Sequence, residues 1–157
     1  MVFLFKQNRD ISYICYNNKI HRLYCFCDKI TMLVFFYVTP NGDAIIQDWI
    51  DSLGKQERAK LENKLDAICR AEMDILPGMV SGTRVGKISK IRVNGQRALR
   101  PMLCKGPFGE DEITILCAAE EKDRKLKPKD AAKIAKNRMD ELERGVGTRE
   151  QYEPPEA

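Results

Sequence analysis

The sequence predicts an α+β domain, in which a mainly antiparallel sheet has its helices packed on one face. Three observations carry this prediction. Residues 32–38 form an unbroken apolar run that is typical of a buried strand. Two segments with helical spacing of apolar residues follow it. Further along the chain, two strand-like segments flank the pair Asn94-Gly95, a strong hairpin signal.

The two helical segments are expected at residues 43–53 and 55–73. Asp43 is the candidate N-cap of the first, and Gly54 separates it from the second. Pro77-Gly78 ends the second segment. The apolar positions expected to face the sheet are Ile45, Ile46, Trp49, Ile50, Leu53, Leu61, Leu65, Ile68 and Met73.

The later strands are expected at residues 87–93, 97–105 and 113–119, with Pro101 marking an edge or a bulge. A last helix at residues 128–144 is expected to begin at Pro128. The predicted order of elements is therefore β-α-α-β-β-β-α, and the chain contains no internal repeat.

The 157 residues divide into three parts of different composition. Residues 1–31 hold three of the six cysteines and the single histidine, without a sustained strand or helix period. One hypothesis is that the natural chain starts at Met32; the alternative is a genuine N-terminal extension, such as a hairpin added to the sheet. Residues 32–144 form the predicted domain. Residues 145–157 are rich in Gly, Glu and Pro and are expected to be a flexible acidic tail.

The cysteines favour a reducing compartment, the cytoplasm. Cys69, Cys104 and Cys117 lie within apolar patterns, where a reduced thiol acts as a small hydrophobe. His21, Cys25 and Cys27 are too loosely spaced for a typical zinc site, so no metal is expected. No apolar run approaches the length of a membrane span, so no membrane partner is expected either.

The charge is unevenly distributed. The chain carries a net +4, whereas residues 81–106 hold seven basic side chains and no acidic one. Such a concentrated positive field attracts phosphate backbones, and the alternative is a solvated strand edge guarded by Lys and Arg. The seven residues are Arg84, Lys87, Lys90, Arg92, Arg97, Arg100 and Lys105.

Several common active sites are excluded. No histidine follows His21, so nucleophile–histidine systems are absent from the predicted domain. The chain has neither a Walker loop nor a GxGxxG motif, and no small-molecule cofactor is expected.

Five loose motifs, taken in order, resemble the RelE/ParE toxin superfamily, with HigB-like, phage-derived toxins of type II toxin–antitoxin systems as the nearest branch. The resemblance covers about residues 32–144 and implies a RelE-like fold. The motifs are residues 49–53, 87–92, the pair Asn94-Gly95, residues 97–100, and residues 116–122 with 127–129.

This resemblance implies a ribosome-dependent mRNA endonuclease, an mRNA interferase, in which the ribose 2′-OH attacks the adjacent phosphate. By position in the motifs, Arg92 and Arg97 are expected to bind phosphate and stabilise charge, while Lys90 and Lys122 are candidates for proton transfer. Glu120 is an alternative general base. The remaining basic residues expected to bind RNA are Lys87, Arg100, Lys105, Arg124 and Lys125.

The resemblance leaves two other functions open. Relatives of the ParE type inhibit a topoisomerase by binding it, and the chain is alternatively an inactive phage remnant that only binds RNA. Many RNA-cleaving members have a His or Tyr near the end of the last strand or in the C-terminal segment. The predicted domain has neither at those places, and Tyr152 lies in the predicted tail. The implied partners are mRNA on the ribosome and a helix-turn-helix antitoxin encoded nearby.

Overall fold

Twelve strands and four helices make up the part of the chain that the computed structural model describes, which is residues 3–6, 12–16, 19–23, 32–70, 76–105, 108–109 and 111–154. The helices are α1 (Ile45–Ser52), α2 (Lys55–Arg70), α3 (Leu76–Met79) and α4 (Ala131–Glu143). The strands are β1 (Phe3–Lys6), β2 (Ser12–Tyr16), β3 (Lys19–Leu23), β4 (Leu33–Val38), β5 (Val80–Gly82), β6 (Ile88–Ile91), β7 (Ala98–Leu99), β8 (Met102–Lys105), β9 (Glu112–Cys117), β10 (Glu120–Lys122), β11 (Lys125–Lys127) and β12 (Thr148–Gln151).

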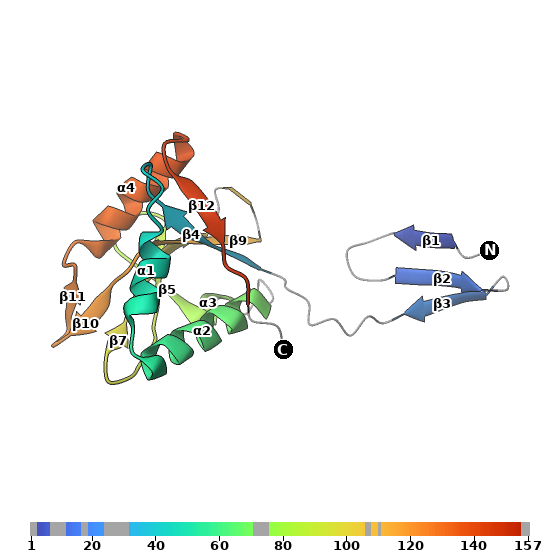
Figure 1. Cartoon of the computed structure of the whole chain (residues 1–157), viewed down its shortest axis with the longest axis horizontal. Coiled ribbons are helices and arrows are strands. Elements are labelled where there is room, and N and C mark those ends of the chain that lie inside the picture. The colour runs from blue at the N-terminus through green and yellow to red at the C-terminus, as the bar shows by residue number, and fades with distance from the viewer. Residues whose placement is uncertain are drawn as a thin grey trace.

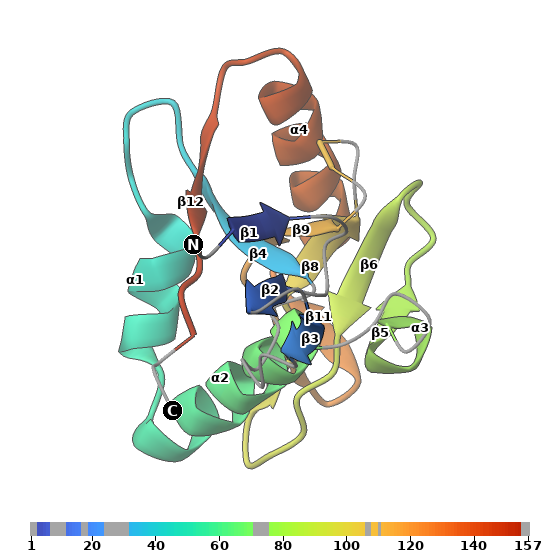
Figure 2. The same cartoon turned by 90° about the vertical axis from the view of Figure 1, so that its right-hand side faces the viewer.

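A six-stranded sheet forms the centre of the domain, in the order β12-β4-β9-β8-β6-β5 (Figures 1 and 2). The pair β4 and β9 is parallel, and every other pair of neighbours in this sheet is antiparallel. The predicted α+β class with a mainly antiparallel sheet is therefore confirmed.

Helices cover both faces of this sheet, so the prediction that they pack on one face is wrong. Val34 and Phe36 of β4 pack with residues of α1 and α2, whereas Tyr37 packs with residues of α4. The two layers lie on opposite sides of the strands in Figures 1 and 2. The reason is strand alternation: consecutive apolar residues point to opposite faces, and an unbroken apolar strand must be covered on both.

The two predicted helices are confirmed with small shifts at their ends. Ile46 and Ile50 of α1 are buried, as are Leu61, Leu65 and Ile68 of α2; Met73 lies outside the described residues. Asp43 does not cap α1, which starts at Ile45, because its carboxylate accepts a hydrogen bond from Thr39 Oγ1 at 3.0 Å.

The predicted return strand is divided in two. Val93 and Leu99 form an isolated antiparallel bridge, so the loop is longer than the two-residue turn that Asn94-Gly95 suggests, and Gly95 does not have a positive φ. The chain then breaks at Pro101, and the register against β9 shifts between Met102 and Leu103. The bulge expected near Pro101 is confirmed.

A hairpin that the sequence does not predict follows β9. Strands β10 and β11 pair antiparallel, and β10 also pairs with β7, giving a second sheet of order β11-β10-β7. The two residues between the strands, Asp123 and Arg124, have φ angles of 52° and 59°. Positive φ at both central residues matches the twist of a two-residue hairpin, although non-glycine residues seldom adopt it. Helix α4 starts at Ala131, three residues after the Pro128 predicted to open it.

The chain after α4 is also more ordered than predicted. Residues 148–151 form β12, which extends the sheet beside β4. Tyr152 continues this pairing through its backbone N–H, which donates to Val34 O at 2.8 Å, and its ring packs beside Phe36. The expected flexible tail is therefore a strand over these residues.

Strand β2 pairs with β1 and with β3 in a separate antiparallel sheet. The hypothesis that the natural chain starts at Met32 stays a prediction. Within the described residues, no helix is both long and apolar enough to cross a membrane.

Candidate functional site

The four residues predicted to be catalytic lie on two different faces of the strands. Lys90 is half-buried and Arg92 exposed. Both alternate in register with Ile88, which packs in the α4 core, so they point to the α4 face. Lys90 and Arg92 do share a face, as predicted, and we call this pair the strand surface.

Arg97 and Lys122 belong to the opposite face. Glu120 and Lys122 alternate with Glu121, whose partner across the hairpin, Leu126, packs in the α4 core. Arg97 binds Glu120 and therefore lies on the α1–α2 side with it. Tertiary structure thus separates residues that the sequence motifs place together.

An ion pair between Arg97 and Glu120 forms the centre of this second surface. Arg97 Nη2 donates to Glu120 Oε1 at 2.5 Å and Nε donates to Oε2 at 3.2 Å, while half of the Arg97 side chain (50%) stays exposed. The hydrogen bond and the charge of Glu120 raise the pKa of Arg97 above its ordinary value, with a smaller contribution from Glu57. The carboxylate is held by one exposed guanidinium, which an incoming phosphate can compete for.

Three lysines of the hairpin surround this pair on the same face. Lys122 stands opposite Lys125, and Lys127 stands opposite Glu120. All three are exposed, and among the described residues none of them has an ion-pair partner. Like charges directly opposite each other destabilise a strand pair, so this hairpin concentrates charge at a cost to its own stability. We call Arg97, Glu120, Lys122, Lys125 and Lys127 the hairpin surface.

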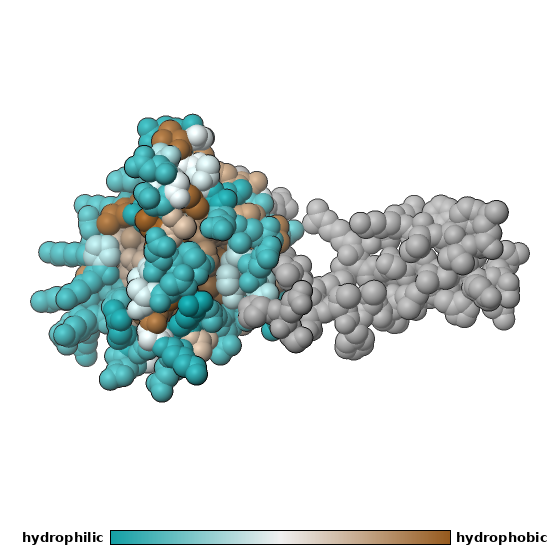
Figure 3. Space-filling model, viewed as in Figure 1, coloured by the Kyte–Doolittle hydropathy of each residue, from teal (hydrophilic) through white to brown (hydrophobic). Residues whose placement is uncertain are grey.

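The hairpin surface lies at one border of the molecule. Hydrophilic side chains project outward there in Figure 3, at the left, where Figure 1 places β10 and β11. The loop before β7 meets α2 on this side: a Cβ added to Gly95 would lie 3.2 Å from Lys60 Nζ. Lys60 thereby adds a further positive charge beside the surface.

Arg100, predicted to bind RNA, is a buried structural residue instead. It is 8% exposed, and Nε donates to Glu121 Oε2 at 2.8 Å. Nη1 donates to the carbonyls of Leu99 and Val93, and Nη2 donates to Asn94 Oδ1. The prediction fails because Arg100 is buried by its contacts with Glu121 and the 93–99 loop, and the sequence does not show these contacts.

The other predicted RNA-binding residues are exposed but scattered. Arg124 and Lys125 are at the tip of the hairpin, and Lys87 precedes β6. Lys105 ends β8, opposite Ile113, away from the hairpin. Only Arg124 and Lys125 are therefore placed close to Lys122 by the hairpin.

Sequence reasoning missed the hairpin that brings Lys122, Lys125 and Lys127 together. The available signal was the run from Glu120 to Lys127 with a polar pair, Asp123-Arg124, at its centre. The pair contains no glycine, so it does not fit the usual turn pattern.

The chemistry available on the hairpin surface is that of a carboxylate among cations. No group of three or more His, Cys, Asp or Glu side chains within the described residues is arranged to hold a metal ion. A carboxylate can accept a proton, and Arg and Lys can stabilise a phosphorane or protonate a leaving oxygen. No family model, curated protein or solved structure matches this chain.

Proposed function

We propose that this protein is the toxin of a type II toxin–antitoxin module, of the RelE/ParE superfamily, and acts on RNA through the hairpin surface. The observation that carries the proposal is the group of lysines without ion-pair partners in the described structure around the Arg97–Glu120 pair. Mixed charges are the norm on protein surfaces, so three such lysines on one face of a short hairpin, with Glu120 as the one acidic residue of that face, favour a polyanionic partner.

The geometry supports cleavage by 2′-OH attack. The Glu120 carboxylate would accept the proton of the 2′-OH while the new 2′-O–P bond forms and the P–O5′ bond breaks. Arg97 would transfer its hydrogen bonds from Glu120 to the phosphate oxygens, stabilising the charge of the phosphorane. Lys122 would donate a proton to the leaving 5′-oxygen. The products would be a 2′,3′-cyclic phosphate and a free 5′-hydroxyl.

The test is induced expression followed by mapping of RNA ends on ribosome-bound mRNA. We expect growth arrest together with new 2′,3′-cyclic phosphate ends. Glu120→Gln should reduce cleavage by about 10²-fold or more if this carboxylate is the general base. Glu143→Gln is the matched control, because Glu143 is an exposed carboxylate on α4 without an ion pair to a described residue. Growth arrest without cyclic phosphate ends would exclude the nuclease.

One observation favours the non-catalytic, ParE-like alternative. Tyr37 and Tyr152 are the only tyrosines in residues 32–154, and neither lies on the hairpin surface. Tyr37 donates to Glu141 and Tyr152 donates to Asp66. A toxin that inhibits a topoisomerase would cause a DNA-damage response without RNA cuts. A chain that causes no growth arrest at all would be the inactive phage remnant.

The neutralising partner would be a small helix-turn-helix antitoxin with an acidic segment. Such a segment would complement the hairpin surface and the exposed cation Arg92 of the strand surface. Co-expression with the neighbouring reading frame should restore growth. If no neighbouring product restores it, the antitoxin part of the proposal fails.

A further inference from the structure

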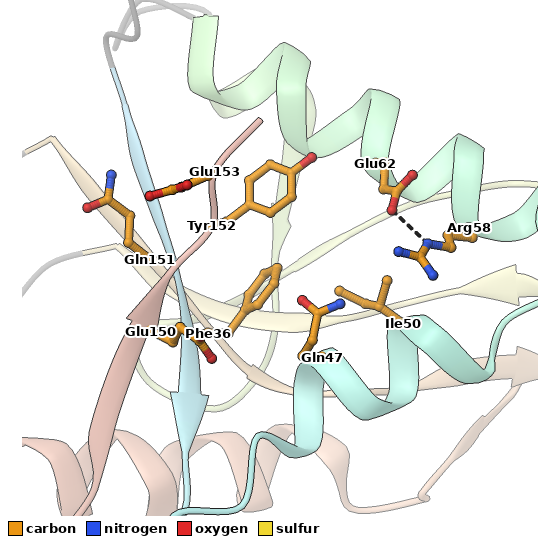
Figure 4. A pocket seen from close by; sticks show the side chains of 9 residues that line it. All are labelled: Phe36, Gln47, Ile50, Arg58, Glu62, Glu150, Gln151, Tyr152 and Glu153. Carbon is orange, nitrogen blue, oxygen red and sulfur yellow. Dashed lines mark hydrogen bonds and ion pairs between the residues drawn. The ribbon is translucent and has the colours of Figure 1, made fainter. Parts of the chain in front are cut away.

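A pocket of about 350 Å³ lies on the α1–α2 face of the domain (Figure 4). Phe36 of β4 and Tyr152 after β12 form one wall, with their ring centroids 5.6 Å apart. Gln47 and Ile50 project from α1 toward the rings, and the Arg58–Glu62 pair closes the side formed by α2. The volume falls in the range of roughly 300–1,000 Å³ that is usual for ligand sites.

The residues around the pocket carry a net negative charge. Arg58 is its one basic lining residue, and its charge is already opposed by Asp51 at 2.9 Å and Glu62 at 2.8 Å. Glu150 and Glu153 line the rim, and neither has an ion-pair partner among the described residues. Burial, the hydrogen bond to Asp66 and the charges of Asp66 and Glu62 all raise the pKa of Tyr152. Aromatic rings next to carboxylates are the surroundings that a guanidinium or ammonium group prefers.

Beside the pocket runs an open strand edge. β12 is the last strand of the six-stranded sheet and pairs with β4 alone. Thr148, Glu150 and Gln151 are exposed, and among the described residues β12 forms a backbone ladder with β4 alone. An unpaired edge is a template for an added strand, whose side chains fall alternately on the two faces. Residues that line the pocket come directly from this edge strand and its continuation.

We propose that β12 and the adjoining pocket bind an extended basic segment of a partner polypeptide, which adds a strand to the sheet and places one Arg or Lys side chain between Tyr152, Phe36 and Glu150. The backbone of the segment would pair with β12, and the carboxylates of the rim would neutralise the basic group. No residue that lines the pocket belongs to the hairpin surface, so the pocket would bind a protein partner whether or not the chain cleaves RNA.

The experiment measures, by fluorescence anisotropy, the binding of a nine-residue Thr/Val-rich peptide with a central Arg to the full chain. We expect the matched peptide with citrulline in place of Arg to bind about tenfold more weakly, because it keeps the shape and loses the charge. A peptide N-methylated at alternate residues should lose binding, because it cannot complete the strand ladder.

Variants of the chain locate the contact. Glu150→Gln with Glu153→Gln should weaken binding of the Arg peptide by about tenfold, and both residues are exposed, so folding is retained. Asp48→Asn with Glu143→Gln removes two exposed carboxylates that do not line the pocket, and binding should stay within about twofold.

Four results would each overturn the proposal. The first is no binding of the Arg peptide to the intact chain. The second is equal loss in the control variant, which would indicate general attraction between charges. The third is unchanged binding of the N-methylated peptide. The fourth is that arginine amide or spermidine binds as tightly as the peptide, which would make the pocket a site for small cations.

Discussion

Arg100 lies buried against Glu121, and its Nε donates a hydrogen bond of 2.8 Å to that carboxylate. The neighbouring pair, Arg97 with Glu120, has the same chemistry but an arginine side chain that is half exposed. Arg100 also donates a second hydrogen bond to the carbonyls of Val93 and Leu99, which already accept each other's backbone N–H. Two arginines three positions apart therefore have different roles: one holds the loop, and the other faces solvent beside the lysines.

Replacing these two arginines should affect stability very differently. Arg100→Ala leaves Glu121 without its donor and empties a buried site, while the carbonyls of Val93 and Leu99 keep each other's backbone N–H. We expect a loss of about 2–4 kcal/mol in the free energy of unfolding. Arg97→Ala breaks a solvent-exposed pair and should cost less than about 1 kcal/mol. Urea denaturation of both variants measures the difference. Similar losses would show that the burial of Arg100 contributes little.

The separation of the predicted site residues onto two faces can be measured by RNA binding. If RNA follows the hairpin surface, Arg97→Gln with Lys122→Gln should lower the salt dependence of binding by about 1.4 in log–log slope, the value for two phosphate contacts on a single strand. Lys90→Gln with Arg92→Gln should leave the slope nearly unchanged. A larger effect of the second pair would move the RNA to the strand surface.

The order of the C-terminal segment depends on Tyr152. Its hydroxyl donates to Asp66 Oδ1 at 2.6 Å, and its ring packs on Phe36. Tyr152→Phe should cost about 1 kcal/mol of stability, the net value of one hydrogen bond. Tyr152→Ala should cost about 2–3 kcal/mol and make residues 148–151 susceptible to proteolysis. Rapid cleavage of the unsubstituted chain at β12 would contradict this assignment.

Tyr37 should make stability depend on pH in the alkaline range. Burial, the hydrogen bond to Glu141 and its charge raise the pKa of Tyr37 to about 12, whereas the ordinary value is 10. Because the pKa is raised, the folded state keeps the Tyr37 proton to a higher pH than the unfolded state does. The contribution of Tyr37 to stability is therefore full below pH 10 and is lost as the pH rises toward 12. We expect the free energy of unfolding of the unsubstituted chain to exceed that of Tyr37→Phe by about 1 kcal/mol at pH 8. This difference should shrink above pH 10. A difference independent of pH would show that Tyr37 does not titrate in this way.

The sequence alone determined most of the local structure. The apolar run at residues 32–38 and the helical spacing around Ile46 and Leu61 are patterns in which each residue depends on near neighbours, and the strands and helices appear where those patterns predict. The concentration of basic residues in residues 81–106 is likewise a property of the sequence.

Only the tertiary structure decided what faces what. Helix α4 packs on the far face because both sides of β4 are apolar, and periodicity within one segment does not state which helix covers which side. Three features depend on contacts between different strands. They are the burial of Arg100, the separation of Lys90 from Lys122, and the pairing of β12 with β4. Such contacts depend on long-range pairing, whose energy comes from partners distant in the chain and is not encoded in any one segment.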